Sequence, residues 1–436
     1  MAKEKFTQSI TFKAMIVAAL TLILLIPNKM IQNLIEERQE RSYETVAKIN
    51  EKWSKAQTIC GPILSIPYEV HVLDTAKKVV SVKLHQLNII PEELTVDVKL
   101  FPEERYYGIY KTILYKSDIN ISGTFGKINL NAIKADKILW EDATITMGVS
   151  DLKGITNSLN FIFNNQSYTA ESKGRDYDIG KKLTVSIQDN ELSQREKSTF
   201  KCQLNLNGSS NMEFIPVGKS TKVQVAGAWK SPGFIGNFSP QYTLDENGFD
   251  ATWNIMHFNH SIPESWQDDK VEDFKNASFG VDLVDTVNHY QQNMRSAKYA
   301  LMFIALTFVV FFFVEVLTKK RIHPIQYLLV GIALILFYSL LLSISEQINF
   351  AVAYLIAALA TIGLITIYSH SIFKSGIQTG ILAAILCLLY LYLFVILQLE
   401  DVALLVGSVG LFIILGVIMF VSRKITFYKE EKPPEE

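Results

Sequence analysis

Residues 313–331 read Phe313-Val-Glu-Val-Leu-Thr-Lys-Lys-Arg-Ile-His-Pro-Ile-Gln-Tyr-Leu-Leu-Val-Gly331, a stretch that we call the hinge. One apolar run ends in it near Glu315, three cations follow at 319–321, and a second apolar run starts after the helix-breaking Pro324. If both runs span a bilayer, this loop is cytoplasmic, because short loops rich in Lys and Arg resist translocation. The loop therefore orients the rest of the chain.

The composition predicts two physically different parts. The 436 residues are 49% hydrophobic, which is too apolar for an ordinary soluble protein, but 19% are charged, which is too many for a membrane bundle alone. The formal net charge of -1 and the lack of a basic stripe give no indication of a nucleic-acid partner. The expected partner from composition is the lipid bilayer.

The N-terminal segment is expected to be an uncleaved signal anchor. An uncharged run lies between Lys13 and Lys29, and no small-residue cleavage pattern follows it. We therefore assign residues 1–35 to an N-terminal span with the chain terminus inside. From residue 36 to about Trp53, charged residues at helical spacing predict a stalk that leaves the membrane.

Residues 36–297 are expected to hold this stalk and a mainly-β domain. Short alternating or β-branched segments separated by Gly, Pro, Asn and Asp predict a mostly antiparallel sheet, open on one face or folded into a sandwich. The predicted strands cover 63–72, 79–84, 94–100, 119–125, 143–149, 183–187, 200–206, 223–229 and 249–253.

Residues 298–423 contain five apolar runs that are each long enough to cross a membrane. Their bounds are about 299–317, 325–345, 348–373, 377–399 and 402–422. With the N-terminus inside, every short loop follows the positive-inside rule, and the tail 424–436 is cytoplasmic. The predicted fold is a six-span α-helical membrane bundle, one N-terminal span plus five C-terminal ones, with a large inserted extracytoplasmic mainly-β domain.

Motifs for catalysis, metal binding and cofactor binding are missing from the sequence, and we expect no enzyme, metal or cofactor. A His257 and His260 pair near Asp268 could belong to a metal site, but solvated surface is the simpler interpretation. Cys60 and Cys202 form either a disulfide or two buried thiols. The last five spans carry little interior charge, which favours anchoring over ion transport.

Two groups of residues are candidate sites. In the hinge, Glu315 is expected either to pair with Arg321 or Lys319, or to reach water alone. An aromatic segment of the β domain forms either an apolar cleft or a turn packed on the core. The hinge candidates are Glu315, Lys319, Lys320, Arg321, His323, Pro324, Gln326 and Tyr327, and the periplasmic contact candidates are Trp229, Pro232, Phe234 and Phe238.

The hinge and its surroundings resemble the CreD family of bacterial inner-membrane proteins. The similarity is carried by residues 298–308 and 321–331 in the spans, and by Gly61-Pro-Ile-Leu-Ser-Ile-Pro67 and Trp229-Lys-Ser-Pro-Gly-Phe-Ile-Gly-Asn-Phe238 outside them. The resemblance implies one N-terminal span, a large periplasmic domain and a C-terminal bundle. It also implies a role in cell-envelope integrity, a link to a two-component regulatory system of the Cre type, and altered tolerance of colicins and β-lactams. It transfers no catalytic residue.

We therefore expect a multi-pass inner-membrane protein with both termini cytoplasmic and residues 36–297 periplasmic. Its β domain is expected to bind an envelope protein, a peptidoglycan-related partner or another envelope component. The alternative is a membrane enzyme or a lipid- or glycan-handling protein. A polar cavity with convergent carboxylates or His would favour the enzyme, whereas an exposed apolar patch or an unpaired strand edge would favour binding.

Overall fold

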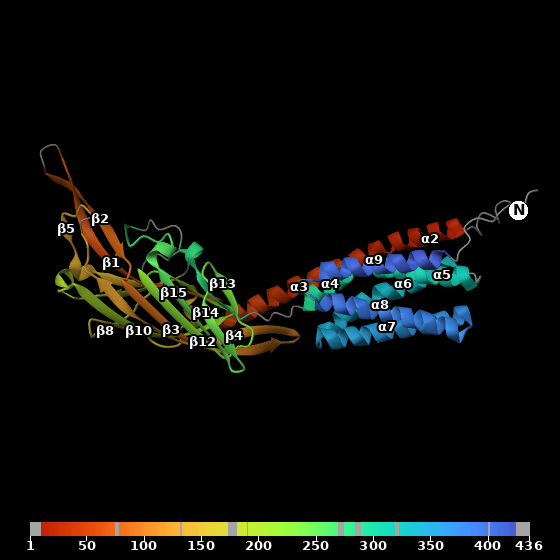
Figure 1. Cartoon of the computed structure of the whole chain (residues 1–436). Helices are drawn as coiled ribbons and strands as arrows, with labels where there is room; N and C mark the ends of the chain where they lie inside the picture. Colours follow the sequence, from red (N-terminus) through yellow and green to blue (C-terminus); the bar gives the residue numbers. More distant parts are fainter. Residues whose placement is uncertain are drawn as a thin grey trace, which may run out of the picture. The chain divides into compact units, whose positions relative to one another are not determined.

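The computed structural model describes residues 10–74, 78–130, 133–172, 181–189, 191–268, 274–283, 289–318, 322–399 and 402–423. The chain divides into two compact units, which are shown in Figure 1. The first unit contains residues 1–42 and 287–436, and the second contains residues 43–286. Helix α3 contributes residues to both units, because the division falls within it.

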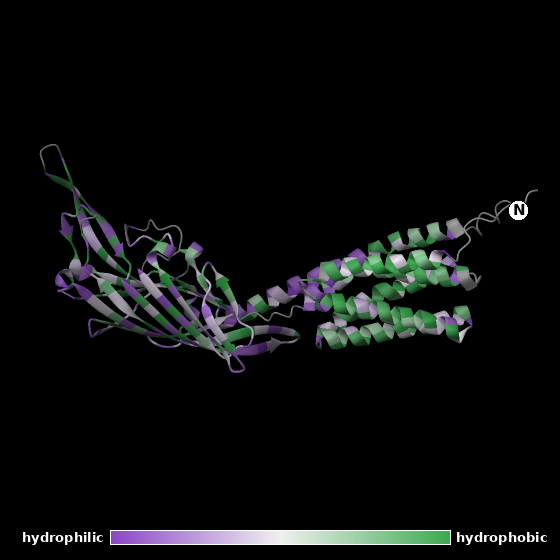
Figure 2. Cartoon of the chain, in the orientation of Figure 1, coloured by the Kyte–Doolittle hydropathy of each residue, from purple (hydrophilic) through white to green (hydrophobic). Residues whose placement is uncertain are grey.

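The first unit is the predicted helical bundle. Five helical segments are long and apolar enough to cross a membrane, and the pair α4 and α5, bent by 45°, makes a sixth span if it is counted as one. Figure 2 shows that helices α5 to α9 are largely hydrophobic. The helices are α2 (Ile10–Ile23), α3 (Leu25–Trp53), α4 (His289–Lys298), α5 (Ala300–Thr318), α6 (Pro324–Ser345), α7 (Phe350–Phe373), α8 (Gly376–Gln398) and α9 (Ala403–Ser422).

The N-terminal helix is a full member of this bundle. Helices α2 and α3 follow each other closely and form one helical segment from Phe12 to Trp53, which contains an apolar stretch long enough to cross a membrane. Leu24 and Ile35 are buried in the same apolar cluster as residues of α5 to α8. The predicted stalk is confirmed as a helix, since α3 continues without interruption to Trp53.

The second unit is a β sandwich, so the predicted mainly-β domain is confirmed. One sheet has nine strands, with β13-β17-β11-β1-β2-β16 as its main path, and the other has the order β14-β15-β12-β3-β4-β10-β7-β8. All described strand pairs are antiparallel except β1 with β11 and β3 with β12. A single apolar cluster contains residues of both sheets, among them Ile63 and Trp253, and forms the layer between them.

All nine predicted strands are present, and most are longer than predicted. They correspond to β1 (Gln57–Leu73), β2 (Val79–Ile89), β3 (Glu93–Tyr107), β4 (Tyr110–Gly126), β6 (Thr144–Val149), β9 (Lys181–Ser186), β10 (Lys197–Ser209), β12 (Ser220–Gly227) and β15 (Gly248–Met256). The strands that were not predicted have two to five residues: β5 (Lys137–Ile138), β7 (Asn160–Phe163), β8 (Gln166–Thr169), β11 (Asn211–Ile215), β13 (Gly233–Gly236), β14 (Gln241–Asp245), β16 (Ser265–Gln267) and β17 (Phe279–Asp282). Such short segments offer too few positions for an alternating pattern.

A buried hydrogen-bond network holds the end of α3 in the β sandwich. The Gln57 side-chain amide donates to Ser54 Oγ at 2.8 Å and to the Asn207 carbonyl at 2.9 Å, and its oxygen accepts from Ser150 Oγ at 3.0 Å. The Asp151 carboxylate accepts from the Ser54 hydroxyl and from the Lys55 backbone N–H. Burial raises the pKa of Asp151, but these hydrogen bonds outweigh it and lower the pKa overall.

The two cysteines of the sandwich are buried free thiols. Cys60 lies on β1 and Cys202 on β10, in different sheets, and neither forms a disulfide. Burial raises the pKa of Cys202 to about 12 and raises that of Cys60 still further. Of the two possibilities left open by the sequence, the structure therefore has two thiols that are protected from reaction.

Candidate functional sites

Glu315 is a buried carboxylate inside the apolar bundle, with only 2% of its side chain exposed. Its Oε1 accepts from the Lys13 ammonium of α2 and from the Ile322 backbone N–H at 3.3 Å. Its Oε2 accepts from the Tyr327 hydroxyl of α6 at 2.9 Å. A buried charge needs such partners, and these three connect α2, α5 and α6 at one end of the bundle, which we call the Lys13 end.

Lys13 was not predicted as a partner of Glu315, because only cations of the hinge were considered. The predicted partners Lys319 and Arg321, together with Lys320, lie outside the described residues, so pairing with them stays a prediction. A signal was nevertheless available. Lys13 precedes the first apolar run and Glu315 ends the second, so the predicted topology places both charges at the same membrane face.

The other hinge residues form the start of α6. His323 is the N-cap, and its Nδ1 accepts from the Ile325 backbone N–H at 3.3 Å. Gln326 reaches back and accepts from the His323 N–H at 2.9 Å, which completes a capping box. Pro324 occupies the first turn, where its missing N–H costs nothing. The His-Pro-x-Gln pattern therefore fixes where the span begins.

A second polar cluster lies at the opposite end of α6, where α3 and α4 contact it, and we call this end of the bundle the Arg38 end. The Arg38 guanidinium of α3 lies 4.0 Å from the carboxylate of Glu346, which also accepts from the Tyr290 hydroxyl at 3.2 Å. Arg38 follows Lys13 by 25 residues, or about 38 Å of helix. This length exceeds a hydrocarbon layer of ~30 Å, so the two clusters suit its two boundaries.

The aromatic segment of the β domain packs on the core. The ring centre of Phe234 on β13 lies 4.7 Å from that of Tyr242, in a tilted arrangement, and 5.9 Å from that of Trp253, in an edge-to-face arrangement. The Phe238 carbonyl accepts from the Trp253 indole N–H at 2.9 Å. Trp229 and Pro232 are half-buried beside them. This is the geometry of the packed turn, and a contact role for these residues stays a prediction.

The outer part of the β1–β2 hairpin extends beyond the neighbouring strands (Figure 1). We call this part, residues 70–74 and 78–85, the arm. Val80, Val82 and Leu84 follow one another on one face of β2 and are 67%, 52% and 66% exposed. On its second edge β2 pairs with β16 at residues 87–89, and Asp268 contacts it at His85 and Gln86, whereas residues 79–84 have no described partner strand there. Within the described chain, the arm thus combines an exposed apolar row with an unpaired strand edge.

A polar hollow of about 450 Å³ lies elsewhere on the sandwich, lined in part by Glu92, Glu93 and His257. Its carboxylates are paired with lysines: Glu92 lies 2.8 Å from Lys219, and Glu93 lies 3.4 Å from Lys197. Burial lowers the pKa of Lys219, but its hydrogen bonds to carboxylates outweigh burial and raise the pKa overall. Both carboxylates are thus engaged in ion pairs with lysines, which is a structural arrangement.

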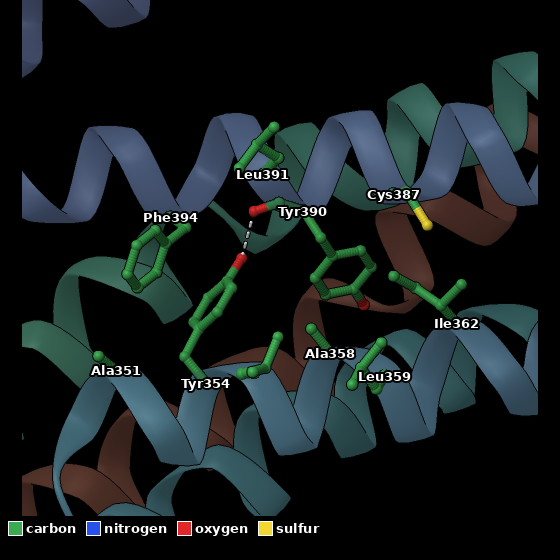
Figure 3. A pocket seen from close by; sticks show the side chains of 10 residues that line it. Ala351, Tyr354, Ala358, Leu359, Ile362, Cys387, Tyr390, Leu391 and Phe394 are labelled. Carbon is green, nitrogen blue, oxygen red and sulfur yellow. Dashed lines mark hydrogen bonds between the residues drawn. The ribbon is translucent and has the colours of Figure 1, made fainter.

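An apolar groove of about 390 Å³ lies between α7 and α8 (Figure 3). The Tyr354 hydroxyl in its wall is engaged within the protein, since it donates to the Tyr390 carbonyl at 2.7 Å. The lining residues are Ala351, Tyr354, Leu355, Ala358, Leu359, Ile362, Cys387, Tyr390, Leu391 and Phe394.

Comparison with known proteins identifies the family. A family model described as Inner membrane protein CreD matches residues 9–428. The Inner membrane protein CreD of Escherichia coli (strain K12) is 31% identical over 416 residues, which cover 94% of this chain and 92% of the relative.

Two solved structures show only remote similarity to this chain. A substrate-bound mutant M1 zinc metallopeptidase from Deinococcus radiodurans is 11% identical and has a TM-score of 0.19, with 38% of this chain and 39% of that chain covered. Native yeast LTA4 hydrolase is 8% identical with the same TM-score, and 51% and 35% of the chains are covered. TM-scores this low carry no argument. The family match, in contrast, covers nearly the whole chain, and the protein belongs to the CreD family of multi-pass inner membrane proteins.

Proposed function

We propose that this protein supports cell-envelope integrity without being an enzyme, and that its β domain binds an envelope component or a partner protein. In this proposal both termini are cytoplasmic and residues 36–297 are periplasmic, an orientation supported by the cations of residues 319–321 and the positive-inside rule. Membership of the CreD family supports the envelope role.

The arm is the observation that carries the binding proposal. An isolated two-stranded ribbon is marginally stable in water, and its apolar row faces solvent. Val80, Val82 and Leu84 are more than half exposed, and full burial of such side chains contributes about 1.5–3 kcal/mol each. Covering the row would therefore contribute roughly 3–5 kcal/mol to binding.

The unpaired edge of β2 suggests how the partner binds. An extended polypeptide that adds to this edge would hydrogen-bond to the backbone, and its alternate side chains would cover the apolar row. The intramolecular pairing of β16 with residues 87–89 already uses the same edge in the antiparallel sense. A partner strand would continue that pairing along the arm.

The polar hollow does not favour the enzyme alternative. A general acid or base needs a carboxylate whose environment moves its pKa toward the working pH. Glu92 and Glu93 are instead engaged in ion pairs with Lys219 and Lys197.

The test places a photo-crosslinking amino acid at Val82 in the full chain in its native membrane. The matched control position is Ile162, which is 40% exposed on β7, a strand paired on both edges. We expect one defined protein or glycan adduct at Val82 and only background at Ile162. Equal adducts at both positions would refute the proposal. Capture of lipid or glycan alone would exclude the version of the proposal in which the β domain binds a partner protein.

The envelope role has a separate test. Exchange of Val82 and Leu84 for serine should sensitise cells to detergent as strongly as loss of the whole protein, because it removes the apolar row. The control is Lys83→Ser, which lies on the opposite face of the same strand. Equal sensitivity for both variants at equal protein levels would argue against the arm as the binding surface.

A further inference from the structure

We propose that the groove between α7 and α8 binds one acyl chain of a bilayer lipid, from the leaflet at the Arg38 end of the bundle. This proposal stands independently of the binding role of the β domain. The orientation proposed above only adds that this leaflet is the periplasmic one.

The groove is shaped by small residues on α7. Ala351 and Ala358 lie along it where larger side chains would close the gap to α8, and Tyr354 and Phe394 form its walls (Figure 3). The hydroxyl of Tyr354 is used by the Tyr390 carbonyl, so the wall offers hydrocarbon and ring faces to an occupant. The chemistry of the lining fits a hydrocarbon chain and not a polar ligand.

The groove opens toward the bilayer. Leu355, Leu359 and Leu391 line it and are 58%, 60% and 64% exposed. Since α7 and α8 are membrane spans, the medium at these side chains is lipid hydrocarbon. An empty groove would forfeit dispersion contacts along its whole wall, whereas a lipid chain would supply them.

The length of the groove matches the depth of one leaflet. It extends along α7 from Ala351, one residue after the helix start, to Ile362, which is 11 residues or about 16 Å of helix. Half of a ~30 Å hydrocarbon layer is about 15 Å. An acyl chain that enters at the Arg38 end would therefore fill the groove with its terminal methyl near Cys387.

The last helix covers a different face of α8. The Tyr392 hydroxyl donates to the Val406 and Gly407 carbonyls of α9 at 3.1 Å. Tyr390 and Tyr392 are two residues apart and so point to roughly opposite sides of a helix. Helix α9 thus packs away from the groove.

The experiment uses the full-length protein in nanodiscs of phosphatidylcholine with a small fraction of lipid that carries a photoreactive diazirine near the end of one acyl chain. After irradiation, mass spectrometry maps the adducts. We expect them to concentrate on the α8 segment 387–394. Helix α9, whose Phe412 is 77% exposed to the bilayer, provides the level of non-specific contact.

Two variants fill the groove and one matched variant does not. Ala358→Phe should reduce adducts at 387–394 by about tenfold, because the ring displaces at least two methylene groups of the chain. Ala351→Phe, in the first turn of α7, is a second variant that fills the groove, in case Ala358→Phe impairs assembly. Ala360→Phe adds the same ring to a residue of α7 that faces the hollow against α6, and it should leave the adducts unchanged.

Several outcomes would overturn the proposal. Adducts spread evenly over α8 and α9 would mean ordinary lipid contact without a site. Adducts that are unaffected by both filling variants would place the chain elsewhere. Intermolecular crosslinking through Cys387 would show that a second copy of the protein covers the groove instead of a lipid.

Discussion

Exchange of Lys13 for methionine should destabilise the bundle by removing the cation that faces Glu315. Methionine keeps the length and the apolar character of the lysine stem, so packing changes little. The Glu315 carboxylate would keep the Tyr327 hydroxyl and the Ile322 N–H, but it would lose its ion pair in a site where only 2% of its side chain is exposed.

The size of the effect follows from burial. Removal of one partner from a fully buried ion pair costs about 3–5 kcal/mol. Lys13 is 29% exposed, so solvent screens the pair and the expected loss is about 2–3 kcal/mol. Glu315→Gln should cost only about 1–2 kcal/mol, because the remaining lysine can extend to water. The double variant should be more stable than the sum of both losses implies.

The assay is denaturant unfolding in mixed micelles, followed by far-ultraviolet circular dichroism, which reports the helices. All five tryptophans lie between Trp53 and Trp266, so their fluorescence reports the β unit and serves as an internal control. Lys13→Met should shift the helical transition and leave the fluorescence transition in place.

Arg321→Met decides between the two possible partners of Glu315. If Lys13 carries the pair, this variant changes the stability of the bundle by less than about 1 kcal/mol, because Glu315 keeps its cation. A loss of about 2 kcal/mol for Arg321→Met with none for Lys13→Met would refute our assignment. Glu315 would then pair across its own loop, as the sequence predicts.

Three further predictions concern the β unit. The pKa of Asp151 is lowered on folding, so its contribution of about 1–2 kcal/mol is present above the unfolded pKa of ~3.9 and is lost as the pH falls through the lower folded pKa. Asp151→Asn should therefore destabilise the unit at pH 6, and this effect should fade as the pH falls through the folded pKa, as measured by fluorescence-detected unfolding. Alkylation of Cys60 and Cys202 by iodoacetamide at pH 8 should be about 100-fold slower in the folded protein than in the unfolded chain, because burial raises both pKa values. Equal rates would contradict the free buried thiols. Gly248→Ala should cost about 2–4 kcal/mol, because φ is +145° and the added carbon would lie 2.1 Å from a backbone oxygen. Gly108→Ala, where φ is +61° and the space is open, should cost less, and the reverse order would contradict the local geometry.

The sequence was sufficient to predict the fold class, because its long apolar runs and its alternating strand patterns are both strong. Apolar runs of about twenty residues have few structural alternatives to a span, and strands such as 94–100 bury every second side chain. The bend between α4 and α5 was not predicted, since α4 is polar and does not resemble a span on its own.

The candidate sites were harder to predict because they depend on long-range contacts. Lys13 and Glu315 are 302 residues apart, and local spacing contains no information about such a pair. The exposure of Val82 is equally hidden, since an alternating strand reads the same whether its apolar face meets a core or solvent. In contrast, the cap formed by His323 and Gln326 is local and was within reach of sequence rules.

The polar contacts at the two ends explain how the first span finds its place. Inside lipid, apolar faces do not drive specific helix association, because lipid tails are as apolar as the helices. Close packing provides one specific contact. Leu24 packs against Gly331 of α6, where a β carbon would lie only 2.2 Å from the Leu24 side chain. The ion pairs of Lys13 and Arg38 give two more, about 38 Å apart along one helix. Ion pairs at both ends determine the depth and the rotation of the N-terminal helix. This helix therefore joins the bundle although the whole β unit separates it from the other spans in the sequence.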